Sequence, residues 1–191
     1  MEVHKLLETL HIAERLKDEL RHCDTSKGRR ESVAEHSWRI ALMALFMQDE
    51  FPELDINKVI RMCLIHDLGE CFTGDIPSFL KSGGDEERER SALETWVASL
   101  PAPYSVELKT LYAEMDALKT DEARLYKALD KLEAVIQHNE SDIATWLPRE
   151  YELNLTYADE NVAFSDYLKR LREEIRRETR DKIAAAEHNR Q

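Results

Sequence analysis

Apolar side chains recur along this chain with the spacing of α-helices. Between short polar breaks they return every three or four residues, which places them on one face of a helix. The stripes with this period are Leu6, Leu7, Leu10, Ala13 and Leu16; Ile56, Val59, Ile60 and Cys63; Leu125, Leu129, Leu132 and Ile136; and Leu168, Leu171 and Ile175. No alternating apolar and polar run is long enough to predict a sheet. The pattern therefore predicts an all-α domain of six to eight helices.

Short segments rich in Gly, Pro, Ser and Asp separate the predicted helices. They are "CDTSKGRRES" (23–32), "FPELD" (51–55), "GDIPSFLKSGGD" (74–85), "SLPAPYS" (99–105) and "TWLPREYELNLTYADEN" (145–161). The segment 81–90, "KSGGDEERER", combines a glycine pair with a charged helix start. It is interpreted either as a lid over a pocket or as an ordinary solvated loop.

The second predicted helix has a well-defined start. In "SVAE" (32–35), the Ser32 hydroxyl can accept from the amide of residue 35 while Glu35 reaches back, which is a capping box. We therefore interpret Glu35 as a helix cap rather than a catalytic group. His36 follows in the first turn, on the same face as Val33 and Ile40.

Several polar residues lie on or beside these apolar stripes. Extending the stripe that ends at Cys63 by one turn reaches His66 and Asp67, and Asp130 is adjacent to Leu129. Each residue alone is typical of a hydrogen-bonded core histidine or a solvated aspartate. Buried polar groups need partners, however, and two histidines and two aspartates directed inward together favour a metal site.

Composition and charge narrow the possible functions. The net charge of −12 disfavours general nucleic-acid binding and leaves cations as natural ligands. No apolar run is long enough to span a membrane, and the N-terminal segment lacks the apolar core of a signal peptide. The three cysteines form no CxxC pair. We therefore expect a reduced, cytoplasmic protein without nucleic-acid or membrane partners.

The order His36, His66-Asp67, Asp130 resembles the H…HD…D signature of the HD-domain metal-dependent phosphohydrolases. The resemblance is greater to the small 5′-deoxynucleotidase branch, and the segments that carry it are "ESVAEHSWR" (31–39), "HDLGECFTGDIP" (66–77) and "KALDKLEA" (127–134). It implies one HD domain over residues 1–191, with a core from about 5 to 175 and a charged C-terminal helix at 162–188. It also implies an all-α fold and, frequently, a homodimer.

Family membership further implies one divalent metal ion held by His36, His66, Asp67 and Asp130. Two imidazoles and two carboxylates suit Mn²⁺, Co²⁺, Fe²⁺ or Zn²⁺. Members with two metals add histidines between the HD pair and the last aspartate, and residues 68–129 contain none. His4, His11, His138 and His188 lack a motif context and are expected on the surface.

The resemblance also implies that Glu70 and Asp75 lie in the substrate pocket. Glu70, three residues beyond Asp67, is placed to accept a proton from water; the alternative is a surface glutamate after a helix end. Asp75 is expected either to orient the sugar or protonate the leaving oxygen. Its alternative is an Asx turn before Pro77.

Phosphate binding requires local positive charge, and Arg21 is the first candidate. The 5′-deoxynucleotidases carry an Arg-Trp pair here, in which the Trp helps to exclude a ribose 2′-hydroxyl. This chain has Arg21-His22, so we expect weak discrimination between ribose and deoxyribose. Lys131 and Lys81 are further phosphate candidates, with solvated surface lysines as the alternative.

The expected function is a metal-dependent phosphomonoesterase that releases phosphate from small nucleotides, mainly (deoxy)nucleoside 5′-monophosphates. Two alternatives remain open. The chain is either an HD hydrolase of another phosphate compound, such as a nucleoside triphosphate or a cyclic nucleotide, or a non-catalytic module that senses nucleotides. The intact set of candidate ligands together with Glu70 favours an enzyme.

Overall fold

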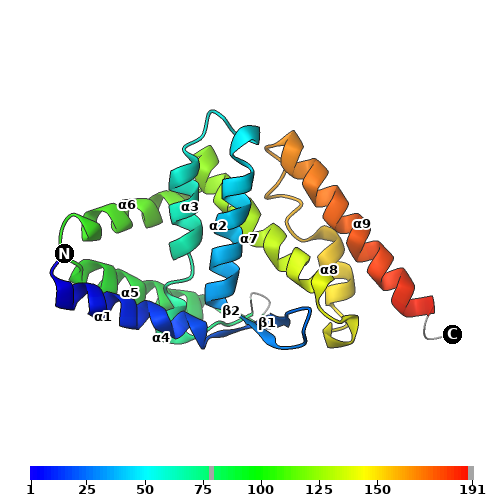
Figure 1. The fold of residues 1–191 in the computed structure, drawn as a ribbon, viewed down its shortest axis with the longest axis horizontal. Helices are drawn as coiled ribbons and strands as arrows, with labels where there is room; N and C mark the ends of the chain where they lie inside the picture. Colours follow the sequence, from blue (N-terminus) through cyan, green and yellow to red (C-terminus); the bar gives the residue numbers. More distant parts are fainter. Residues whose placement is uncertain (78–79, 189–191) are drawn as a thin grey trace.

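The computed structural model describes residues 1–77 and 80–188, and helices dominate this part of the chain (Figure 1). The helices are α1 (Val3–Ala13), α2 (Val33–Phe46), α3 (Ile56–Ile65), α4 (Glu70–Thr73), α5 (Gly83–Ser99), α6 (Tyr104–Ala117), α7 (Asp121–Glu140), α8 (Glu150–Thr156) and α9 (Asp166–His188). Short 3-10 turns lie at Glu14–Lys17, Gln48–Glu50 and Ile143–Thr145. The predicted all-α class is confirmed.

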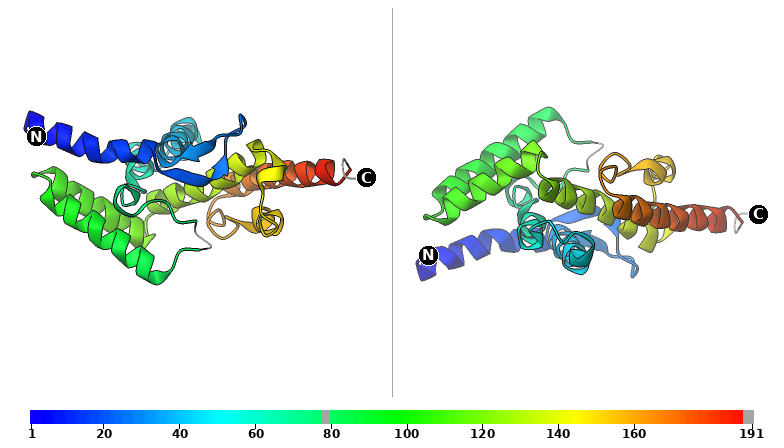
Figure 2. Two further views of the ribbon diagram at one scale, coloured as in Figure 1. Left: turned by 90° about the horizontal axis from the view of Figure 1, so that it is seen from below. Right: turned by 90° about the horizontal axis from the view of Figure 1, so that it is seen from above.

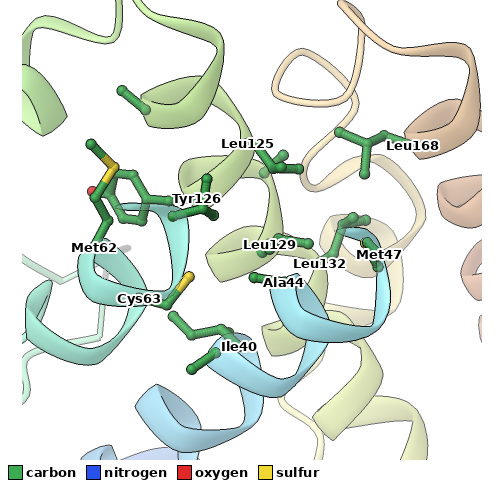
Figure 3. Close-up of a cluster of buried hydrophobic side chains, with 14 of the residues drawn as sticks. Ile40, Ala44, Met47, Met62, Cys63, Leu125, Tyr126, Leu129, Leu132 and Leu168 are labelled. Atoms are coloured by element: carbon green, nitrogen blue, oxygen red, sulfur yellow. The ribbon is translucent and has the colours of Figure 1, made fainter. Parts of the chain in front are cut away.

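The helix α7 lies at the centre of the bundle, where α2, α3, α6 and α9 contact it. Figure 3 shows its buried side chains meeting Ile40 and Ala44 of α2 and Met62 and Cys63 of α3. On α7 the inward residues are Leu125, Tyr126, Leu129 and Leu132. Burying one leucine contributes roughly 1.5–3 kcal/mol, so this stripe fixes the position of α7 and of every polar side chain on it.

The start of α2 is fixed by the predicted capping box. The Ser32 hydroxyl accepts from the Glu35 amide at 3.3 Å, and the Glu35 carboxylate accepts from the Ser32 amide at 2.9 Å. Glu35 also pairs with the exposed Arg29. The cap places His36, which is fully buried, in the first turn of α2.

A small antiparallel hairpin precedes α2 and was not predicted. Its strands are β1 (Leu20–Asp24) and β2 (Arg30–Ser32). They are too short to show an alternating pattern, and the turn between them depends on Gly28, whose φ of 79° is easily adopted only without a side chain. The strand β1 contacts α7, which brings Arg21 and His22 to the centre of the molecule.

The apolar stripe of α1 lies largely outside the core. Leu6, Leu7 and Leu10 are 45%, 51% and 53% exposed, and only Leu16, in the turn after the helix, is buried. Figure 2 shows α1 extending toward one end of the molecule, apart from the α5–α6 pair. The spacing of apolar residues therefore predicted the helix α1 correctly, but it did not predict that the apolar face of this helix is exposed.

Two further segments differ from expectation. Most of segment 81–90 forms the first turns of α5 rather than a loop, because Ser82 and Asp85 make a second capping box. The predicted break at 74–85 includes residues 78–79, which lie outside the described residues. The helix α9 begins at Asp166 instead of residue 162.

Among the described residues, no helix has the length and apolar character needed to cross a membrane.

Candidate metal and phosphate site

Three helices bring the four predicted metal-binding residues together. His36 comes from the first turn of α2, His66 and Asp67 from the end of α3, and Asp130 from the middle of α7. The His36 Nε2 atom lies 3.3 Å from Asp130 Oδ1, and His66 Nε2 lies 3.0 Å from Asp67 Oδ2 and 3.9 Å from Asp130 Oδ1. The two imidazole rings are 5.2 Å apart between centroids.

The chemistry of this cluster fits a divalent metal ion. The Nε2 atoms of His36 and His66 are buried and make no hydrogen bond to any described residue. Ligand atoms of His36, His66 and Asp67 all lie within 4.8 Å of one another. Two unpartnered imidazole nitrogens beside two carboxylates form the mixed nitrogen and oxygen donor set that first-row divalent metals prefer.

The other nitrogen of each imidazole has a fixed partner. His36 Nδ1 lies 2.5 Å from Oε2 of Glu133, and His66 Nδ1 lies 2.9 Å from the Cys63 carbonyl oxygen. Since each partner is an acceptor, each Nδ1 donates to it, and Nε2 is the nitrogen of each ring that is left to bind a metal. Glu133 was not among the residues predicted from the sequence. The available signal was its place three residues after Asp130, inside an apolar stripe where a carboxylate needs a partner.

Both aspartates of the cluster are held in the charged form. Burial opposes ionisation of Asp67, but the neighbouring His66 outweighs it and holds the pKa of Asp67 below its usual value. Burial likewise opposes ionisation of Asp130, and Lys127 and Lys131 hold its pKa well below the ordinary range. Deprotonated carboxylates are the form that binds a metal.

Positive charge gathers around the same carboxylates. Lys127 Nζ lies 2.8 Å from Asp130 Oδ2 and Lys131 Nζ lies 3.8 Å from it, so Lys127 is the nearer cation and was not identified from the sequence. Arg21 Nη1 lies 3.9 Å from Asp67 Oδ2. These three cations line one cavity of about 290 Å³. Lys81 also lines this cavity, where it pairs with Glu89 at 2.5 Å.

Glu70 and Asp75 both reach this cavity. Glu70 begins α4 three residues after Asp67, is buried, and its Oε2 has no partner among the described residues. Burial, together with Asp67 and Asp75, raises the pKa of Glu70 to about 10. Burial also raises the pKa of Asp75. In the absence of a cation, Glu70 therefore carries a proton near neutral pH.

The far wall of the cavity contains a histidine that was expected on the surface. His138 lines the cavity and its side chain is only 16% exposed. Its Nε2 atom lies 3.3 Å from Glu150 Oε1, and His22 Nε2 lies 3.0 Å from the same oxygen. The expectation was wrong because Glu150 belongs to α8, a short helix inside the segment interpreted as a break.

Comparisons with known proteins agree with this geometry. The HD domain family matches residues 13–172. The chain is 35% identical over 112 residues to 5′-deoxynucleotidase HDDC2 of Bos taurus, covering 58% of this chain and 54% of that protein. It is 33% identical over 114 residues to 5′-deoxynucleotidase HDDC2 of Homo sapiens, covering 59% and 55%. The chain thus spans about half the length of the curated relatives it matches.

Solved structures extend the match to nearly the whole fold. A predicted metal-dependent phosphohydrolase from Magnetospirillum magnetotacticum MS-1 superposes with a TM-score of 0.78 at 30% identity, covering 94% of this chain and 93% of that one. A conserved hypothetical protein from Pyrococcus furiosus gives a TM-score of 0.69 at 28% identity, covering 90% and 99%. The resemblance inferred from the sequence motifs is confirmed, and the chain belongs to the HD domain family.

Proposed function

We propose that this protein is a metal-dependent phosphohydrolase that releases phosphate from (deoxy)nucleoside 5′-monophosphates. The observation that carries the proposal is the pairing of two buried, unpartnered imidazole nitrogens with two ionised carboxylates in a cavity lined by cations. The 5′-deoxynucleotidase activity named for the curated relatives supports the substrate class.

In this proposal His36, His66, Asp67 and Asp130 hold one divalent ion, of the group Mn²⁺, Co²⁺, Fe²⁺ or Zn²⁺. When bound, such an ion acts as a Lewis acid that neutralises phosphoryl charge and makes water more acidic. Glu133 and the Cys63 carbonyl keep the two imidazoles in the tautomer that binding needs.

The phosphate group is bound by Arg21, Lys127 and Lys131. Arg21 is anchored by a hydrogen bond from its Nε to Glu31 at 3.0 Å, which leaves its terminal nitrogens directed toward Asp67. A guanidinium held in this way matches two phosphate oxygens at once. The two lysines add positive charge from the adjacent turns of α7.

In this proposal Glu70 accepts a proton and Asp75 donates one. A cation in the neighbouring cluster favours the charged form of Glu70 and so lowers its pKa toward the range of a general base. The unpartnered Glu70 Oε2 then accepts a proton from the attacking water. Asp75, whose pKa burial raises, is suited to give a proton to the leaving oxygen.

We also propose that the protein is a cytoplasmic homodimer. On α2, Trp38 is 59%, Leu45 41% and Phe46 80% exposed. A second copy would cover these apolar side chains. Light scattering on the purified protein, with the double variant Trp38→Glu and Phe46→Glu as monomeric control, tests the assembly; a wild-type mass of one chain would contradict it.

The activity is tested by phosphate release from metal-stripped protein. Nucleoside 5′-monophosphates, triphosphates and cyclic nucleotides are each supplied with Mn²⁺, Co²⁺, Fe²⁺ or Zn²⁺, and His66→Ala serves as the inactive control. We expect turnover of the monophosphates that depends on added metal. Preference for a triphosphate or cyclic nucleotide would identify another hydrolase, and tight nucleotide binding without release would identify a sensor.

A further inference from the structure

The cavity extends well beyond the metal cluster, along α7. Asp130, Ala134 and His138 all line it, and they succeed one another on one face of the helix. Because each helical residue advances 1.5 Å, His138 lies about 12 Å along the axis from Asp130. The cations and the candidate metal ligands occupy the Asp130 end. The opposite end, formed by His22 of β1, His138 and α8, has no part in the reaction described above.

Glu150 organises this opposite end without being available to a ligand. Its Oε1 faces the Nε2 atoms of both His22 and His138, and its Oε2 accepts from the Leu147 amide at 2.7 Å. Glu150 is almost completely buried. Because both oxygens of Glu150 already have partners, this carboxylate holds the two imidazoles in place. Its negative charge also disfavours a second phosphate group at this end of the cavity. The group bound here is therefore not a further phosphate.

Asn154 supplies the polar contact that this end offers. It lies one turn after Glu150 on α8, lines the cavity, and is only 3% exposed. Its Nδ2 atom has no hydrogen-bond acceptor among the described residues, and Arg172 Nη2 donates at 3.0 Å to the backbone carbonyl oxygen of Asn154 rather than to this side chain. A buried amide donor without an acceptor is costly. An acceptor from a bound molecule would satisfy it.

The surfaces around Asn154 suit a flat, neutral ring. Leu153 of α8 and Tyr157, the residue that follows the helix, line the cavity, as does Ala134 of α7. Lys131 Nζ lies 5.2 Å from the centre of the Tyr157 ring and covers one of its faces. Apolar walls with one convergent donor are typical of sites for heterocycles that carry acceptors on their edge.

We propose that this far end of the cavity binds the nucleobase, and that the Asn154 amide donates to an acceptor on the base edge. The proposal rests on the proposed function and adds an orientation, with the phosphate at Asp130 and the base between β1 and α8. Asn154 is then a specificity-determining residue for the leaving group, since it contacts the part of the substrate that is not transferred.

Two experiments test this. In the first, kcat/KM of the metal-loaded wild type is compared for nucleoside 5′-monophosphates and for ribose 5-phosphate, which lacks a base. We expect a preference of about tenfold or more for the nucleotides. Asn154→Leu should lower kcat/KM for the nucleotides about tenfold, mainly through KM, and reduce that preference. Glu152→Gln, an exposed position on the same helix, is the matched control and should retain the preference.

The second experiment does not depend on catalysis. Calorimetry measures binding of the free nucleosides, which lack phosphate, to wild type, Asn154→Leu and Glu152→Gln, with thermal unfolding recorded for each to establish that they fold. Asn154-dependent nucleoside binding supports the base site even if no phosphate ester is hydrolysed, an outcome that would overturn only the proposed function. Equal turnover of ribose 5-phosphate and nucleotides by wild type, or nucleoside binding indifferent to Asn154→Leu, overturns the base site.

Discussion

The Nδ1 atom of His36 lies 2.5 Å from Oε2 of Glu133, and both side chains are fully buried. This contact joins the first turn of α2 to the centre of α7. It also determines which imidazole nitrogen faces Asp130. Glu133 therefore acts on the candidate metal site through His36, without lying in the cavity.

Replacing Glu133 by Gln should weaken metal binding. The amide keeps the volume of the side chain but loses the charge that fixes His36, and loss of such an outer partner typically costs about 10- to 100-fold in metal affinity. Titration of the metal-stripped protein with Co²⁺, followed by visible absorbance, measures the change. Glu140→Gln, an exposed position on α7, is the control; equal affinities in the two variants would contradict the role of Glu133.

Metal binding should release protons at neutral pH. Burial and Arg21 lower the pKa of His36, but Glu133 and Asp130 outweigh them and raise it to about 9 in the metal-free protein. Below pH 9 a metal must therefore displace a proton from His36, and the cation also favours loss of the proton from Glu70, so affinity should rise at least about tenfold per pH unit from pH 6 to 8. Calorimetry in two buffers of different ionisation enthalpy counts the protons. Identical heats in both buffers would refute this linkage.

Glu70→Gln should separate chemistry from binding. The variant should keep its metal, since Glu70 is not among the four clustered ligands, and it should lose about 10²- to 10⁴-fold in kcat because the amide accepts no proton. KM should change little. Metal content and single-turnover rates provide the measurement. A near-normal rate would move the proton acceptor elsewhere, with Asp75 as the next residue to test.

Arg21→Lys should show the opposite kinetic pattern. Lysine keeps the positive charge beside Glu31 and Asp67 but loses the planar fork that matches two phosphate oxygens. We expect KM to rise about tenfold with a smaller change in kcat. Arg61→Lys, an exposed arginine on α3, is the control. An unchanged KM in Arg21→Lys would exclude Arg21 from the phosphate contacts.

Sugar preference should be weak. His22 Nε2 lies 3.0 Å from Glu150 Oε1, and an imidazole held there would cover less of a bound sugar than the larger tryptophan that the family resemblance led us to expect at this position. Ribonucleotide and deoxyribonucleotide monophosphates should therefore differ by less than about tenfold in kcat/KM. Paired kinetics on the two sugars with the same base provide the test. Discrimination of several hundredfold would mean that another group excludes the 2′-hydroxyl.

The sequence predicted which side chains cluster at the centre of the candidate site, because helical periodicity and residue order carry that information. His36 shares a face with Val33 and Ile40, and Asp130 is adjacent to Leu129, so the apolar stripes alone placed these side chains inward. The motif order then indicated which inward residues belong together. The start of α2 could also be predicted, because the two residues of its capping box, Ser32 and Glu35, are only three positions apart in the sequence.

The rest of the site depends on contacts between segments distant in sequence. The position of Glu133 in an apolar stripe indicates burial, but its partner His36 is brought to it only when α2 packs against α7. Glu150 and Asn154 gain their surroundings only when α8 packs against α7 and β1, and α8 is too short for its periodicity to be recognised. The apolar stripe of α1 shows that periodicity alone does not predict burial, because Leu6, Leu7 and Leu10 lie on an apolar helix face that is exposed.

The helices α7 and α8 contribute different parts of the cavity, and this affects which substitutions the protein tolerates. The helix α7 carries Asp130 and Glu133 on the same turns as the leucines that hold the bundle together, so a change there alters folding and metal binding at once. The residues of α8 and the hairpin border the cavity from outside this core. Substitutions in α8 can therefore change the substrate range while Asp130 and the leucines of α7 stay as they are, whereas β1 is less free to change because it carries Arg21.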